Sequence, residues 1–142
     1  MRNLISFAVA FCAFQQVALA DHTVLRTLCR RMSYETTELE RGARLVIGPR
    51  PTYRQQYAYE HVMILRRTAL NFETVVYYGE LDDHNHDLRI RRAYAQLDRD
   101  LYYARQTLED LFYPYDDHTP NSLRTLMSSI ERLNMQIRYV LP

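Results

Sequence analysis

The chain has 142 residues, of which 18 are basic and 17 are acidic, so its formal net charge is +1. This near neutrality argues against a nucleic-acid-binding protein, because such proteins carry a basic excess that displaces counterions from the phosphates. All the basic residues are arginine, and the chain has 12 tyrosines and no tryptophan.

The first 20 residues have the pattern of a secretory signal peptide. Arg2 precedes an apolar run from Leu4 to Phe14, and the residues at 18–20 are Ala-Leu-Ala, a small-x-small cleavage pattern. The apolar run is about half of the ~20 residues that a membrane-spanning helix needs. We therefore expect a signal peptide over 1–20 and a mature chain over 21–142 that does not span the membrane. The protein would be periplasmic or secreted.

Cleavage after residue 20 would change both the charge and the cysteine count. It would remove Arg2 and Cys12, which leaves equal numbers of basic and acidic residues and a single cysteine, Cys29. A lone cysteine forms no internal disulfide, so noncovalent packing must hold the fold together. Cys29 lies beside an apolar stripe and is expected to be a small buried hydrophobic residue. The alternative is a dimer, formed through a disulfide at Cys29 or through a helix face.

Four segments of the mature chain have the apolar periodicity of helices. Glycines and prolines gather at three boundaries, 46–52, 78–87 and 113–121, and the segments between them repeat apolar residues at steps of three and four. This predicts helices at about 23–44, 53–78, 88–113 and 120–141. The third and fourth have regular, coiled-coil-like seams: Ile90, Tyr94, Leu97, Leu101, Ala104, Leu108 and Leu111, then Leu123, Leu126, Ile130, Leu133, Ile137 and Val140.

Short connections make successive helices antiparallel. The sequence thus predicts one all-α domain, an antiparallel up-down-up-down four-helix bundle. The alternative is a group of three helices with the first helix loosely docked. Capping residues agree with the boundaries, because Thr52 and Gln55 form a T-x-x-Q capping box and Gly79 suits the end of the second helix.

The stretch at 82–87, Asp-Asp-His-Asn-His-Asp, is the candidate metal site. Imidazole and carboxylate groups bind copper and zinc, and an up-down bundle would bring this connection to the same end as residue 22. The candidate Cu or Zn ligands are His22, His84, His86, Asp82 and Asp83. The competing interpretation is a turn that begins the third helix, because Asp83, Asn85 and Asp87 are all good N-caps.

Catalysis finds no support in the sequence. The chain lacks the G-x-S-x-G and H-E-x-x-H motifs and a glycine-rich phosphate loop, so we expect neither an enzyme nor a cofactor other than Cu or Zn. Glu35 is the one carboxylate on an apolar stripe. His61 is expected to be a partly buried structural histidine, and His118 a residue of a capping loop at the opposite end.

Two tyrosine doublets are the candidate partner surface: Tyr77, Tyr78, Tyr102 and Tyr103. Adjacent helical residues do not share a face, so we expect one tyrosine of each pair to pack while its neighbour meets solvent. Exposed tyrosines near arginines are typical of binding surfaces. The sequence therefore favours an exported binding or scaffold protein for an unidentified protein or envelope component. The alternative is a periplasmic or secreted Cu- or Zn-binding protein.

Overall fold

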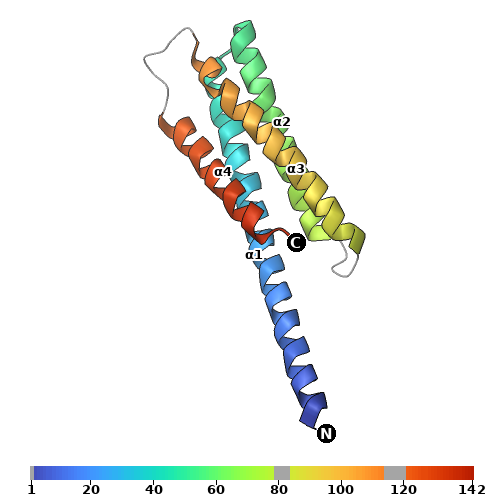
Figure 1. Cartoon of the computed structure of the whole chain (residues 1–142). Coiled ribbons are helices and arrows are strands. Elements are labelled where there is room, and N and C mark those ends of the chain that lie inside the picture. Colours follow the sequence, from blue (N-terminus) through green and yellow to red (C-terminus); the bar gives the residue numbers. More distant parts are fainter. Residues whose placement is uncertain (1, 79–83, 114–120) are drawn as a thin grey trace.

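A computed structural model describes residues 2–78, 84–113 and 121–142, with side chains from residue 22 onward except that of His84. The chain is all-α, as predicted, and the described residues form no strand. Figure 1 shows the elements along the chain: α1 (Arg2–Ile47), α2 (Tyr53–Tyr78), α3 (His84–Thr107), the short 3₁₀ helix η1 (Leu108–Phe112) and α4 (Asn121–Val140).

The helices pack side by side as in a bundle (Figure 1). α1 packs against α2 and α4, and α2 packs against α3, while α3 and α4 approach each other at few points. Contacts between α1 and α2 run in opposite order along the two helices: Ser33 donates to the carbonyl of Ala69, whereas Tyr59 donates to Glu40. The N-terminal part of α1 extends beyond the other helices (Figure 1).

The apolar seams meet in one core. Every predicted seam residue of the third helix is buried, and α2 buries Ala58, Val62, Leu65, Ala69, Phe72 and Val76 at the same helical spacing. In α4 the buried set departs from the predicted one, because Met127 is buried while Leu126 and Val140 are only partly so. In α1 the core residues include Leu25, Cys29, Met32, Leu39 and Ala43.

The start of α2 confirms the predicted capping box. The Thr52 backbone N–H donates to Gln55 Oε1 at 2.9 Å, and the Gln55 N–H donates to Thr52 Oγ1 at 3.3 Å. Both are reciprocal bonds that satisfy helix-end donors. The Gln55 amide nitrogen also donates to the carbonyl of Leu111 in η1 at 3.1 Å. The predicted cap at Gly79 falls outside the described residues.

Helix boundaries differ from the predicted ones in α1 and α3. α1 is continuous from Arg2 to Ile47 and is not limited to 23–44. α3 begins at His84, one turn before the predicted 88, and its last turn tightens into η1 before residue 113. The earlier start has a physical reason, since His86 lies four residues before Ile90 and continues the seam of α3 into the core.

Gly42 permits the close approach of α1 and α4. A Cβ atom at this position would collide with the buried side chain of Leu123. Gly42 lies inside a helix, where glycine is unfavourable compared with alanine. Its role here is therefore to make space for a packed neighbour.

Cys29 is buried in this core, as expected. Its side chain has no exposed surface, and burial raises the pKa of the thiol from 9.0 to about 12, with a smaller contribution from the charge of Glu73. A sulfur in this position cannot reach a second molecule, so the disulfide-linked dimer is not compatible with the folded structure.

Because only the thiolate is reactive, we expect Ellman's reagent to leave Cys29 unmodified in the native protein and to label it fully in denaturant. A Ser122→Cys variant, exposed on α4, is the positive control. The raised pKa also has a consequence for stability. The stabilisation from the protonated thiol is present below about pH 9 and is lost as the pH rises towards 12. Fast native labelling, or a Cys29→Ala variant with the same alkaline unfolding curve, would contradict this account.

Candidate binding groove between α3 and α4

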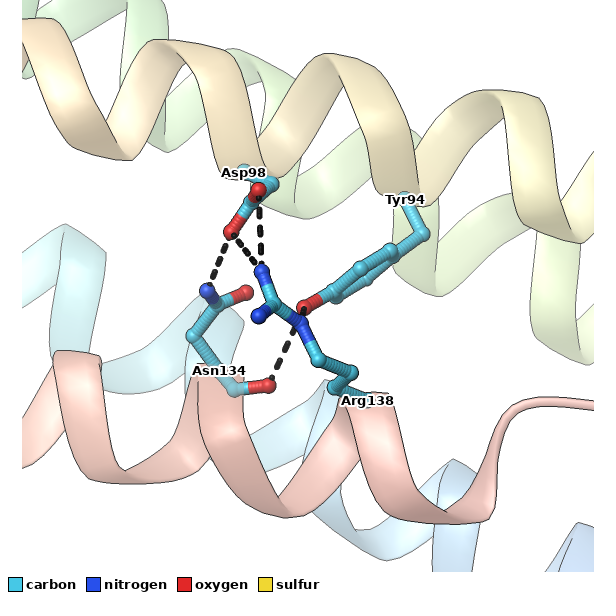
Figure 2. A network of polar contacts seen from close by, with 4 residues as sticks. All are labelled: Tyr94, Asp98, Asn134 and Arg138. Carbon is cyan, nitrogen blue, oxygen red and sulfur yellow. Dashed lines mark hydrogen bonds and ion pairs between the residues drawn. The ribbon is translucent and has the colours of Figure 1, made fainter.

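A polar network joins α3 to α4 (Figure 2). The Asn134 amide donates to Asp98 Oδ1 at 2.6 Å, and Arg138 Nη2 donates to both carboxylate oxygens of Asp98 at 3.2 and 3.3 Å. Tyr94 donates its hydroxyl hydrogen to the backbone carbonyl of Asn134 at 3.3 Å and accepts a hydrogen bond from Arg138 Nε. Burial raises the pKa of the Tyr94 phenol, so this hydroxyl stays protonated and can donate.

Two further ion pairs cross from α4 to α3 and η1. Glu131 pairs with Arg105, and Arg124 makes two parallel bonds of 3.1 and 2.7 Å to Glu109. The α4 members, Arg124, Glu131 and Arg138, are seven residues apart, which is the spacing of flanking charges in a coiled coil. We refer to the three pairs, 98–138, 105–131 and 109–124, as the ion-pair ladder.

The ladder spans a groove with an apolar floor. One hollow of about 360 Å³ lies between the 98–138 and 105–131 pairs and is lined by Leu101, Tyr102, Asn134 and Met135 in addition to paired residues. A second hollow, of about 430 Å³, continues beyond the 105–131 pair and includes Leu108, Met127 and Ser128. Leu101, Leu108 and Met127 are themselves buried core residues. In the groove, buried core residues therefore lie directly beneath the charged side chains of the ladder.

Large exposed side chains form the rim of the first hollow. Tyr102 is 59% exposed and Met135 is 54% exposed, and both line it. Tyr102 also continues into a row of ring contacts across α3 and α2, through Tyr103, His61, Tyr57 and Tyr53. Aromatic and methionine side chains are enriched in protein interfaces, so this rim has the composition of a binding surface.

Asn134 is the least satisfied polar group of the groove. It is 7% exposed, and its Oδ1 accepts no hydrogen bond although its amide nitrogen is bonded to Asp98. A buried acceptor without a donor is unfavourable and uncommon in folded proteins. This oxygen is itself buried and lies on the side of Arg138 (Figure 2).

The tyrosine doublets do not form one surface. Tyr78 is exposed and Tyr77 is half-buried beneath Arg26, as expected for a pair on different faces. Tyr102 and Tyr103 are both exposed, so the prediction that one of them packs is wrong.

The seam of α3 explains this difference. Leu101 and Ala104 occupy the buried positions, so the two tyrosines between them both lie on the exposed side of the helix, where their ring centroids are 5.6 Å apart. Tyr103 stacks on His61 of α2, and His61 is 16 residues from Tyr77, or roughly 24 Å along the helix. The two doublets therefore belong to separate parts of the surface.

The candidate metal ligands are only partly brought together. Asp82, Asp83 and the side chain of His84 lie outside the described residues. His86, expected in a solvent-exposed loop, is instead in the first turn of α3 and only 2% exposed, and neither of its ring nitrogens has a partner.

The predicted meeting of residue 22 with the start of the third helix does occur. His22 and Asp87 line one hollow of about 280 Å³, together with Leu25 and the end of α4. Within the part of the chain whose side chains are described, no group of three or more His, Cys, Asp or Glu residues could hold a metal ion.

Two other residues named from the sequence have structural partners. Glu35 is nearly buried and pairs with Arg31 at 2.9 Å. His61 is half-buried between Tyr57 and Tyr103, which agrees with a structural histidine. His118 is not among the described residues.

Comparison with protein families, with curated proteins and with solved structures found no match to this chain. Among the described residues, no helix is long and apolar enough to cross a membrane.

Asp98 is the centre of the network, and its removal should be measurable. Asp98→Ala would leave the nearly buried Asn134 amide and Arg138 without their acceptor, so we expect unfolding free energy to fall by about 1–2 kcal/mol in urea titrations. The matched control is Glu38→Ala, which breaks the exposed 2.9 Å pair with Arg41 and should cost at most about 0.5 kcal/mol. Equal losses in the two variants would show that the network adds nothing beyond a surface pair.

Proposed function

We propose that this chain is an exported helical-bundle binding protein that acts as an adaptor or scaffold and has no catalytic activity of its own. The mature form would be an antiparallel up-down-up-down bundle that begins at Asp21, located in the periplasm or outside the cell. Support for export comes from the signal-like pattern of residues 1–20 and from the way α1 extends past the other helices (Figure 1). Leu25 is the first described core residue along the chain, so cleavage after residue 20 would remove none of the described core residues.

The observation that carries the binding function is the open seam between α3 and α4. The other neighbouring helices pack closely, whereas here an ion-pair ladder lies over an apolar floor, with Tyr102 and Met135 exposed at the rim. The exposed Tyr102 and Met135 side chains are available to a partner, and their burial would stabilise a complex. The proposed partner is a protein or another envelope component.

A photo-crosslinking amino acid at Tyr102 tests this proposal in cells of the source organism. We expect a discrete crosslinked product at position 102, because a partner in the groove would cover that side chain. Tyr34, which is 65% exposed on α1 and does not line the groove, is the matched control and should give none. Absence of a product at 102, or the same products at 34 and 102, would refute the groove as the binding surface.

A second candidate function is binding of Cu or Zn at the opposite end of α3. The supporting observation is that His22 and Asp87 line the same hollow. After cleavage, the new terminal amine would lie one residue from His22, and amine, imidazole and carboxylate groups all bind these metals. His86 is adjacent to Asp87 but would have to leave the core to take part.

Calorimetric titration with Cu(II) and Zn(II) separates the two candidates. On protein shown by mass to begin at Asp21, the metal hypothesis predicts sub-micromolar binding that His22→Ala weakens by at least about tenfold. His61→Ala, at the half-buried histidine of α2, is the control and should bind as the unmodified protein does. Titrations without heat, or equal binding in the two variants, would eliminate the metal function.

A further inference from the structure

We propose that the outer face of the α2–α3 pair binds the surface of a membrane that contains anionic phospholipids. This inference goes beyond the proposed function, because it concerns a different surface from the groove between α3 and α4 and does not depend on that groove. It depends on three features of the face: arginines without partners, few exposed carboxylates, and exposed tyrosine and isoleucine side chains.

The contacts between α2 and α3 determine which residues form this face. The two helices lie side by side (Figure 1). Thr68 of α2 donates to Asp100 of α3 at 2.6 Å, and His61 of α2 stacks on Tyr103 of α3 with ring centroids 5.6 Å apart. Residues three or four apart share one face of a helix. The stripe of α3 next to α2 therefore consists of positions 89, 92, 96, 99 and 103.

Four exposed arginines of this face have no partner. Arg89, Arg92 and Arg99 lie on the stripe of α3, and Arg67 is exposed on α2. Within the residues whose side chains are described, none of the four forms an ion pair, a hydrogen bond or a ring contact. The arginines of the ion-pair ladder, in contrast, are each bonded to a carboxylate. The charges of these four are therefore available to an anionic group outside the chain.

Few carboxylates oppose these charges. Asp100 is only 7% exposed, and its oxygens accept hydrogen bonds from Thr68 and Gln96. Glu60 is the one exposed carboxylate among the described residues of α2 and α3, and it accepts a hydrogen bond from Gln56 at 3.2 Å. The other acidic residues of these helices, at 73, 87 and 98, are half-buried on the sides next to α1 or α4. The face is consequently net positive and complementary to anionic headgroups.

Large side chains with apolar parts are exposed beside the arginines. Tyr53, Tyr57 and Ile64 follow one another on α2 at steps of four and seven, so they share a face, and all three are exposed. On α3, Tyr103 is exposed one turn from Arg99. Tyrosine is enriched at the boundary between lipid and water, because its ring is apolar and its hydroxyl stays hydrated. Arginine, tyrosine and isoleucine together suit binding at the membrane surface without insertion across it.

The shape of the face favours a membrane over a single anionic polymer. The four arginines do not line any of the three hollows described above, and neither do the exposed tyrosines beside them. A polymer such as single-stranded nucleic acid is held in a positively charged groove. A membrane surface, being broad, can contact side chains that project from the outside of two neighbouring helices. The near neutrality of the whole chain also disfavours nucleic acid.

A single tryptophan tests the proposal, because the chain contains none of its own. Tyr53→Trp places an indole on the face, and Tyr139→Trp on α4 is the matched control, since the two tyrosines are 83% and 89% exposed. The protein begins at Asp21, because the apolar run at 4–14 would itself bind lipid. With vesicles of equal parts phosphatidylglycerol and phosphatidylcholine, we expect the emission to move to shorter wavelength at position 53 and to stay unchanged at 139. No shift at 53, or equal shifts at both positions, would overturn the proposal.

Charge-matched variants then test the arginines, with the indole at position 53 as the reporter. Arg92→Gln/Arg99→Gln should weaken binding to the anionic vesicles by at least about tenfold, because each arginine near an anionic surface strengthens binding by about fivefold. The control, Arg30→Gln/Arg132→Gln, removes the same charge from exposed residues of α1 and α4 and should cost less than about twofold. Circular dichroism should show an intact fold in both. Equal losses in the two double variants would place binding elsewhere and overturn the proposal.

Soluble polyanions distinguish a membrane from a polymer. A single-stranded oligonucleotide and alginate, an acidic polysaccharide, are titrated at the same ionic strength as the vesicles. Weaker binding of both supports the membrane, and binding of either that is as tight or tighter overturns the membrane in favour of that polymer. The comparison of positions 53 and 139 is repeated in the full chain, where we expect the same difference, and its absence there would also contradict the proposal.

Discussion

The wide spacing between α3 and α4 determines which side chains can connect these two helices. α4 packs closely on α1, where Gly42 removes the side chain that would keep the two helices apart. α3 packs closely on α2, through seam residues such as Phe72 and Tyr94, whose rings lie 6.0 Å apart. With α3 and α4 each attached to a different neighbour, their own side chains must span the remaining gap. Long charged side chains can do this, and short apolar ones cannot.

That constraint explains why the interface is built from arginine. A guanidinium group on a long side chain can make two directed bonds at once, as Arg124 does to Glu109 and as Arg138 does to Asp98 and Tyr94. A lysine ammonium lacks that planar fork. Arginines also lie over tyrosine rings elsewhere on the surface, at Tyr77 and Tyr113. The sequence alone gives little meaning to the use of arginine in place of lysine. In the structure, these contacts depend on the planar guanidinium group.

The sequence predicted the fold far better than it predicted the groove. The bounds of α2 were correct because its capping box and its apolar seam both act within one helix. The start of α3 was wrong because histidine is not counted as apolar, although His86 continues the seam at the same spacing as Ile90 and Tyr94. The heptad spacing of Arg124, Glu131 and Arg138 was visible in the sequence and could have indicated the ladder. The gap between two helices, in contrast, depends on what each packs against, and no local pattern reports it.

Gln55 has a consequence for how the bundle opens. Its side chain closes the first turn of α2 through the Thr52 backbone N–H and at the same time holds the carbonyl of Leu111 in η1. The beginning of one helix and the tightened end of the next therefore share a single amide group. Neither can fray without releasing the other, so this end of the molecule should exchange its backbone hydrogens as one cooperative unit. The end of α3 adjoining the groove is held through that amide, which links local unfolding at the start of α2 to the shape of the binding surface.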